Sequence, residues 1–346
     1  METFILIVIA VGAAVLAGLR QRTSGARPPA PDWPQAPASA APAAPSKPLP
    51  LKRSAAGSGL LSGVATWGYQ LQKVNMKAVE ASSFDLMVID YSKDGSDAQA
   101  FTPGDIQRMK AKPDGSRRLV LAYMSIGEAE SYRYYWDPTW AAAKPGWLLD
   151  ENPDWKENYA VCYWDPVWQR TFCGGPSSYL DKIIAAGFDG VYLDKCDVFE
   201  DLEVRNKSAA SSRPDLEGDM VAFIARLSQY AKGRKPTFAV IMQNAENLLE
   251  HEPLREAIDA VAKESLLYGQ PGPEKPNPKD EVAFAKRALD LALKSSRTVL
   301  VIEYLSDAEI IRSATATLDG FGYLSTVSAK NRKLDHLNPD PATASL

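Results

Sequence analysis

Histidine is almost absent from this 346-residue sequence, and cysteine is scarce. Two histidines, His251 and His336, leave little material for a histidine-based zinc site or a serine–histidine–aspartate triad. The three cysteines are too few for a disulfide-dense scaffold, and they lack the Cys-x-x-Cys spacing of many zinc sites. Cys162 and Cys173 could form a disulfide in an oxidising compartment, with buried free thiols as the alternative.

The sequence also lacks an excess of basic residues and a glycine-rich phosphate loop. The net charge is −4, and the residues after position 53 carry 41 acidic against 33 basic side chains. A mildly acidic body argues against nucleic acid as a partner and suits a neutral or cationic ligand. No strand-like run leads into a glycine-rich turn, which argues against a phosphate-binding open sheet.

No apolar run has the full length of a membrane span. The longest, Phe4–Leu19, has 16 residues, which places it between the core of a signal peptide and a spanning helix. Glu2 precedes it, and Arg20 and Arg22 follow it, so its flanks differ from those of an ordinary cleaved signal peptide. The positive-inside rule would even place the body in the cytoplasm. We expect residues 1–22 to be an uncleaved anchor or an atypical export signal.

This segment predicts a secreted or membrane-anchored protein of the cell envelope or periplasm, with its orientation left open. It is also the one part of the chain expected to touch a membrane. Residues 23–56 follow as a linker rich in proline and alanine, with nine of the 25 prolines between positions 28 and 50. Such a tract forms an extended spacer and no core. The folded body is expected over residues 57–336, with a tail at 337–346.

Short apolar runs recur through the body, with helical patterns between several of them. Apolar residues recur at helical spacing in 215–233 and 280–296. The runs are apolar throughout, as in a parallel sheet covered by helices, and their number matches a (β/α)8 TIM barrel. A doubly wound open sheet is the alternative. The eight runs are 63–71, 84–92, 118–127, 188–194, 237–245, 258–265, 298–306 and 320–326.

An aromatic-rich insertion interrupts this rhythm after the third strand. Residues 132–168 hold six of the eight tryptophans and five tyrosines, and 157–166 read as an extra short strand. So many aromatics exceed the needs of an ordinary connection. They predict either a small satellite core under a long loop or a platform on which sugar rings stack.

Carboxylates, tyrosines and amides stand where the predicted strands end. In a (β/α)8 barrel these C-terminal ends carry the reactive groups. Each acid alone could be a helix cap or a solvated loop residue, but their coincidence at one rim favours a site. Paired carboxylates without histidine or cysteine ligands fit glycoside hydrolysis, which needs two acids and no metal or organic cofactor.

The motifs resemble glycoside hydrolase family 114, the endo-α-1,4-polygalactosaminidases and their relatives. They are WGYQLQ, DLMVIDYS, AYMSIGEAE, GFDGVYLD, QNAENLL and AKESLLYG, and they cover roughly residues 61–326. The resemblance implies an extracellular (β/α)8 barrel that acts on galactosamine-rich polysaccharide. It places the catalytic aspartate at Asp194, after the GFDG strand, and the catalytic glutamate at Glu264. The chain differs from the best-studied members at Lys195, Cys196 and Ser265.

We therefore predict a retaining reaction with Asp194 as nucleophile and Glu264 as general acid/base. A cationic galactosamine chain would be attracted by the acidic rim. The alternative is a membrane-tethered barrel that binds glycan without cleaving it. A metal-dependent hydrolase is a weaker option, because sites built of carboxylates alone suit Mg²⁺ or Ca²⁺. Oligomeric state is not predicted. The expected substrate contacts are Trp67, Tyr69, Asp90, Tyr91, Tyr123, Glu128, Tyr192, Asp197, Asn244 and Glu303.

Overall fold

A computed structural model describes residues 59–339 of the chain. Its main sheet has eight parallel strands in the order β1-β2-β3-β7-β8-β9-β10-β11, and each of the eight predicted runs forms one of them. The N-terminal segment and the proline-rich linker lie outside the described residues. The strands are β1 (Trp67–Gln70), β2 (Leu86–Ile89), β3 (Leu119–Ser125), β7 (Gly190–Asp194), β8 (Ala239–Gln243), β9 (Ala260–Glu264), β10 (Thr298–Tyr304) and β11 (Leu324–Ser328).

The first and last strands of this sheet meet at a seam, so the sheet is nearly closed into a barrel. The indole nitrogen of Trp67 on β1 donates to the carbonyl of Leu324 on β11 at 3.0 Å. The side chain of Asn338 accepts from the backbone nitrogen of Tyr69 at 2.5 Å and donates to the carbonyl of Val327 at 2.7 Å. Asn338 is buried, so the folded body continues past the boundary expected at residue 336.

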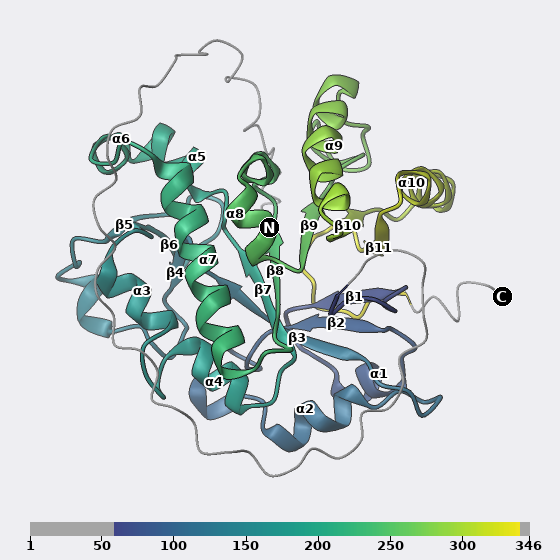
Figure 1. Cartoon of the computed structure of the whole chain (residues 1–346), viewed down its shortest axis with the longest axis horizontal. Coiled ribbons are helices and arrows are strands. Elements are labelled where there is room, and N and C mark those ends of the chain that lie inside the picture. The colour runs from purple at the N-terminus through teal and green to yellow at the C-terminus, as the bar shows by residue number, and fades with distance from the viewer. Residues whose placement is uncertain (1–58, 340–346) are drawn as a thin grey trace, which may run out of the picture.

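Helices surround the strands, as expected for a (β/α)8 barrel (Figure 1). The two helical patterns found in the sequence form the longest of them, α7 and α9. No helix among residues 59–339 is both long enough and apolar enough to cross a membrane. The helices are α1 (Met76–Ala81), α2 (Pro103–Lys110), α3 (Pro166–Phe172), α4 (Tyr179–Ala185), α5 (Val198–Arg205), α6 (Lys207–Ser211), α7 (Leu216–Arg234), α8 (Glu252–Ala257), α9 (Lys279–Lys294) and α10 (Ala308–Phe321), with short 3₁₀ turns η1 (Asp97–Gln99), η2 (Pro138–Ala141) and η3 (Glu246–Glu250).

The insertion after β3 folds into a separate antiparallel sheet in the order β4-β6-β5. Its strands are β4 (Glu128–Glu130), β5 (Leu148–Glu151) and β6 (Asn158–Val161), and β6 is the extra strand expected within 157–166. Most of its tryptophans pack on one another: the ring centroids of Trp140 and Trp147 are 4.9 Å apart, and those of Trp147 and Trp168 are 5.1 Å apart. They pack as part of the large core under the helices, where the first interpretation expected a small separate one. Trp155, 55% exposed, is the exception.

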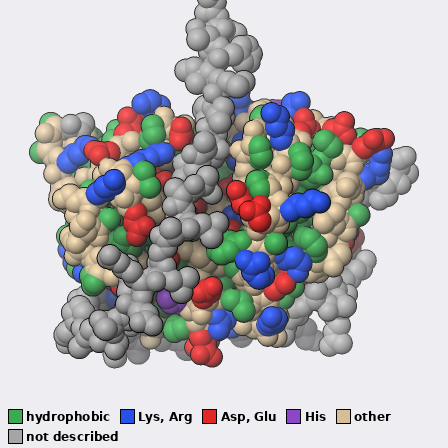
Figure 2. All heavy atoms as spheres, turned by 90° about the horizontal axis from the view of Figure 1, so that it is seen from above, with side chains coloured by type: hydrophobic (Ala, Val, Ile, Leu, Met, Phe, Trp, Pro, Cys, Tyr) green, Lys and Arg blue, Asp and Glu red, His purple; other side chains and the backbone are tan. Residues whose placement is uncertain are grey.

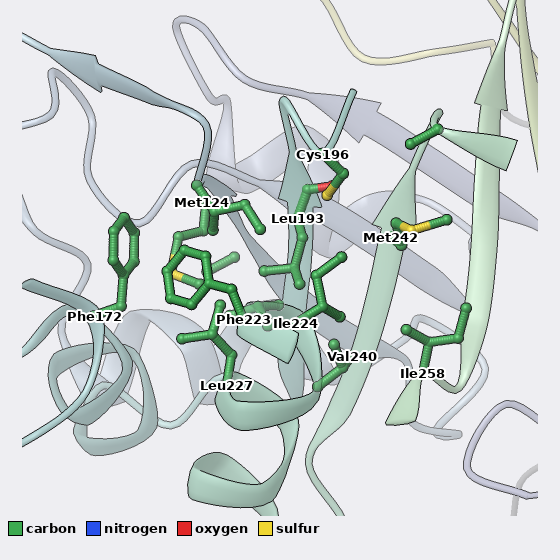
Figure 3. Close-up of a cluster of buried hydrophobic side chains, with 14 of the residues drawn as sticks. Met124, Phe172, Leu193, Cys196, Phe223, Ile224, Leu227, Val240, Met242 and Ile258 are labelled. Atoms are coloured by element: carbon green, nitrogen blue, oxygen red, sulfur yellow. The ribbon is translucent and has the colours of Figure 1, made fainter. Parts of the chain in front are cut away.

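Alternation along each strand sends side chains to two apolar layers. One layer fills the barrel interior and includes Tyr192 and Ile241. The other lies under the helices, where Leu193 and Val240 face α7 (Figure 3). The three cysteines, Cys162, Cys173 and Cys196, are buried free thiols, which is the second of the two states considered for Cys162 and Cys173.

Candidate active site

Asp194 and Glu264 face each other at the C-terminal ends of β7 and β9, with β8 between them. The side chain of Gln243, at the end of β8, bridges the two carboxyl groups. Its Nε2 donates to Oδ1 of Asp194 at 2.7 Å and to Oε2 of Glu264 at 3.0 Å. Because both bonds come from the same nitrogen, Oδ1 of Asp194 and Oε2 of Glu264 cannot be farther apart than the sum of the two distances.

Two buried phenols and the Asn244 amide, which donates to Oε2 of Glu264 at 3.4 Å, supply the other hydrogen bonds to the pair. The Tyr123 hydroxyl donates to Oδ2 of Asp194 at 2.6 Å, and the Tyr304 hydroxyl donates to Oε1 of Glu264. The Tyr69 hydroxyl donates to Oε1 of Gln243 at 3.4 Å, which fixes the orientation of the amide. Every one of these donors is neutral, so the two acids share a site without a directly bonded cation.

A fourth phenol, Tyr192, lies in the barrel interior on the same strand as Asp194. Its hydroxyl is buried and has no hydrogen-bond partner among the described residues. Burial raises the pKa of Tyr192 well above the ordinary value, and the negative charges of Glu264 and Asp194 raise it further. The phenol therefore stays protonated and can donate a hydrogen bond to a group that enters the site.

The electrostatics of the pair favour one shared proton. Burial raises the pKa of Asp194 to about 7, and the negative charge of Glu264 adds to the shift. Two carboxylates this close repel each other when both are ionised, which favours retention of a proton. Below about pH 7 Asp194 therefore keeps a proton in the unliganded molecule, and a proton held at the pair is what acid-assisted displacement requires.

The chain leaves all three strands of the site through a residue in the left-handed region. Lys195, Asn244 and Ser265 have φ values of 57°, 56° and 51°, and they directly follow Asp194, Gln243 and Glu264. Such conformations are unfavourable for residues with a Cβ and collect at functional sites. The Asn244 side chain accepts from the backbone nitrogen of Glu264 at 3.2 Å and thereby holds the loops after β8 and β9 together.

The insertion is locked to the loop that follows Asp194. Lys195 forms ion pairs with Glu128 of β4 at 3.1 Å and with Asp201 of α5 at 3.4 Å. Asn152, from the turn between β5 and β6, donates to Glu128 at 2.8 Å. A Cβ at Gly127 would lie 2.1 Å from the carbonyl oxygen of Lys195, so only glycine permits this approach.

Some predicted substrate contacts lie beside the pair, and others do not. Tyr69, Tyr123, Tyr192 and Asn244 surround it, as described above. Trp67 packs below them in the barrel interior, with its ring centroid 6.1 Å from that of Tyr69.

The remaining predicted contacts are engaged elsewhere. Asp90 pairs with the buried Arg133 at 2.7 Å, and Glu128 pairs with Lys195 at 3.1 Å. Asp197 occupies the N-cap position of α5, without a capping hydrogen bond from its side chain. Tyr91 and Glu303 point away from the barrel interior, Tyr91 into the helix-facing core and Glu303 to the backbone nitrogen of Leu267 at 2.7 Å. In the described part of the chain, no three His, Cys, Asp or Glu side chains are arranged to hold a metal ion.

Sequence reasoning missed Gln243 and gave no role to Tyr304. Strand alternation could have found both. In β8 the inward residues are Ala239 and Ile241, so the next inward position is Gln243. In β10 the same rule selects Tyr304 and sends its neighbour Glu303 outward.

Charges on the outer surface are mixed. Figure 2 shows acidic and basic side chains interspersed over the face seen from above, without a continuous patch of one sign. Around the site, Lys263 pairs with Glu246 of η3 at 2.9 Å, so an acid next to the pair is neutralised here as well. Specific attraction of a cation would therefore depend on the pair itself more than on a broad surface field.

The sequence profile of glycoside hydrolase family 114 matches residues 47–343. An uncharacterized protein of Methanocaldococcus jannaschii is 37% identical over 79% of this chain and 78% of its own length. An uncharacterized protein of Deinococcus radiodurans is 33% identical over 80% of this chain and 83% of its own length.

Two solved structures share the fold. The glycoside hydrolase domain of PelA from Pseudomonas aeruginosa aligns with a TM-score of 0.58 at 21% identity, over 80% of this chain and 99% of that domain. Ega3 of Aspergillus fumigatus, in complex with galactosamine, aligns with a TM-score of 0.54 at 17% identity, over 80% of this chain and 97% of that one. At these identities the likeness shows a common barrel.

Proposed function

The chain belongs to glycoside hydrolase family 114 and is a glycosidase, and we propose that it cleaves a galactosamine-containing polysaccharide with Asp194 and Glu264 as its catalytic pair. The observation that carries this proposal is the bridge from Asp194 through Gln243 to Glu264, which brings two acids together over a floor of protonated phenols. The similarity to Ega3, solved with galactosamine, supports the substrate class.

We further propose that the reaction retains the anomeric configuration. Retaining glycosidases hold their carboxyl groups about 5–5.5 Å apart, whereas inverting ones leave about 6.5–9.5 Å for a water molecule. Both acids bond to one nitrogen, at 2.7 and 3.0 Å, which supports the shorter separation. Asp194 would attack the anomeric carbon, and Glu264 would protonate the leaving oxygen and later activate water.

This division of roles requires the shared proton to reach Glu264. In the unliganded molecule, burial raises the pKa of Asp194 to about 7, so that residue holds a proton at lower pH. A sugar ammonium group bound near Asp194 would favour its ionised form and shift the proton across the pair. A cationic substrate would then prepare the site for its own cleavage.

Digestion of a glycan panel by the purified chain, followed by mass analysis, tests the proposal. We expect shortened oligosaccharides from galactosamine polymers, and none with Asp194→Asn or Glu264→Gln. Activity on a cationic polymer should also fall as salt rises, because salt screens the attraction. Binding to the polymer without any cleavage would instead support the glycan-binding barrel.

Azide rescue tests the division of roles. With the nucleophile removed (Asp194→Gly), added azide should restore turnover and give a glycosyl azide of inverted configuration. With the acid/base removed (Glu264→Gly), the azide product should keep the substrate configuration. The opposite pattern would exchange the roles of the two residues.

A further inference from the structure

Arg332 lies on the segment after β11 and contacts both neighbours that support Glu264. Its guanidinium carbon is 4.8 Å from the centroid of the Tyr304 ring, and its Nη2 donates to the Ser265 hydroxyl at 2.5 Å. Tyr304 is the phenol that donates to Glu264, and Ser265 is the residue that follows Glu264 in the left-handed conformation. Arg332 is therefore linked to Glu264 through two intermediates, the side chain of Tyr304 and the residue Ser265.

The guanidinium is held in place and forms no ion pair among the described residues, although its charge acts on the nearby carboxyl group of Glu303. Within residues 59–339 no acidic oxygen forms an ion pair with Arg332, whereas Lys330, two positions earlier, pairs with Glu274 at 3.2 Å. Gly269 packs against Arg332: a Cβ there would lie 3.0 Å from Nη2, and its φ of 111° already favours glycine. The cation is thus fixed over the Tyr304 ring.

The other groups around Glu264 carry no positive charge. Within the described part of the chain, the titratable groups that face it are Asp194 and Tyr192 from β7, Tyr69 from β1 and Tyr304 from β10. The amides of Gln243 and Asn244 complete the surroundings. Glu303 is also near Arg332, on the helix-facing side of β10.

We propose that Arg332 is a positioning residue that stabilises the negative charge of Glu264 through Tyr304 and Ser265. A cation over the ring polarises the phenol, so that its hydroxyl donates more strongly to the carboxylate. The hydrogen bond to Ser265 fixes the backbone at Glu264. This inference rests on the proposed catalytic role of Glu264. It makes the segment after β11 part of the active site.

The pH dependence of kcat/KM tests this role. In Arg332→Met, the basic limb should move to higher pH by about 0.5–1 unit, because Glu264 must be protonated to act as general acid and its ionised form has lost a stabilising cation. The acidic limb should move less, since it reports the ionisation of Asp194, the proposed nucleophile. Arg332→Lys keeps the charge and should recover part of the shift, and Lys330→Met should match the natural chain. Unchanged limbs in Arg332→Met would overturn the proposal.

A second measurement needs no activity. The loss of Tm caused by Arg332→Met is compared in the natural chain, in Glu264→Gln and in Glu303→Gln. We expect a smaller loss in Glu264→Gln, because the charge that Arg332 serves is gone. A loss that shrinks only in Glu303→Gln would overturn the proposal. If the chain cleaves no glycan, the proposed function fails, and this cycle still decides the role of Arg332.

Discussion

Two aspartates stand at opposite ends of strand β7 in opposite surroundings. Asp189, just before the strand, forms ion pairs with Lys110 at 2.8 Å, Arg117 at 2.5 Å and Lys235 at 3.4 Å. Burial alone would raise the pKa of Asp189, but these three cations hold it below its ordinary value. Asp194, at the far end, has neutral donors and a second acid beside it, and its pKa rises to about 7.

The difference separates stability from reactivity along a single strand. At the N-terminal end, an ionised carboxylate ties α2, the segment before β3 and the C-terminal end of α7 together through its cations. At the C-terminal end, a destabilised carboxylate keeps a proton within reach of a substrate. TIM barrels in general keep catalysis at one face and stability at the other. Here both appear within the motif GFDGVYLD.

The largest expected effect comes from Asp194→Asn. Hydrolysis should fall at least about 10³-fold, because the proposed nucleophile is gone. The same change removes one of two buried, repelling acids, so the free energy of unfolding at pH 8 should rise by about 1–2 kcal/mol. Product analysis and denaturant unfolding measure the two effects. A variant that is both inactive and less stable would contradict the description of the pair.

Asp189→Asn is the matched change at the other end of β7. It leaves three cations without their carboxylate, and we expect the free energy of unfolding to fall by about 3–5 kcal/mol. The kcat of the folded fraction should stay within about twofold of the natural value, because Asp189 touches no part of the pair. Denaturant unfolding and active-site titration measure the two quantities. A large loss of kcat in correctly folded protein would break the comparison.

Gln243→Leu tests the neutral bridge within the site. Both carboxylates lose a hydrogen-bond donor, while the side-chain volume at position 243 changes little. The kcat/KM should therefore fall about 10- to 100-fold. Gln243→Glu is the isosteric partner, and it should be less stable than Gln243→Leu above pH 7 because it adds a third acid. Kinetics and unfolding at pH 6 and pH 8 separate them. Equal pH dependence in the two variants would argue against charge repulsion.

The smallest effect is in the pH dependence of the natural chain. The native pKa of Asp194, about 7, exceeds its value in the unfolded chain, so its contribution to stability is lost as pH rises toward 7. Between pH 6 and pH 8, Tm should fall by roughly 2–4 °C more in the natural chain than in Asp194→Asn. Asp189, with its lowered pKa, contributes the opposite slope, in acid.

The same proton sets the activity profile. The kcat/KM of the natural chain should fall as pH rises above about 7, because the pair then loses the proton that it shares. Initial rates on one galactosamine polymer from pH 4 to pH 9 measure this limb. A rate that keeps rising to pH 9 would contradict a shared proton.

The barrel could be predicted from the sequence because its signal is local and repeated. Each apolar run had the length of a strand. The apolar spacing in 215–233 and 280–296 matched a helix and did not match the alternation of a strand. The position of Asp194 was also predictable, since a strand that ends on an acid in this fold points it at the catalytic rim. Its proximity to Glu264 came from the family resemblance, because 70 residues separate the two in the chain.

The side chains that tune the site were harder to predict. Gln243 is one amide among many in the sequence, and its position between two acids follows from strand order and register. Arg332 reaches the site from a segment with no regular structure, so no period marks it. Asp90 and Glu128 were predicted as substrate contacts, and their ion-pair partners Arg133 and Lys195 are fixed by tertiary packing, which the sequence does not show.

The seam between β1 and β11 has a consequence for how the protein is made. Asn338 completes the seam by bonding to Tyr69, which lies 269 residues earlier. At about 5–20 residues per second, a ribosome needs roughly 15–50 s to proceed from one to the other. Through that time the outer edge of β1 has no partner strand and is open to pairing with other nascent chains. Chaperones that cover this edge during translation should therefore raise the yield of closed barrels.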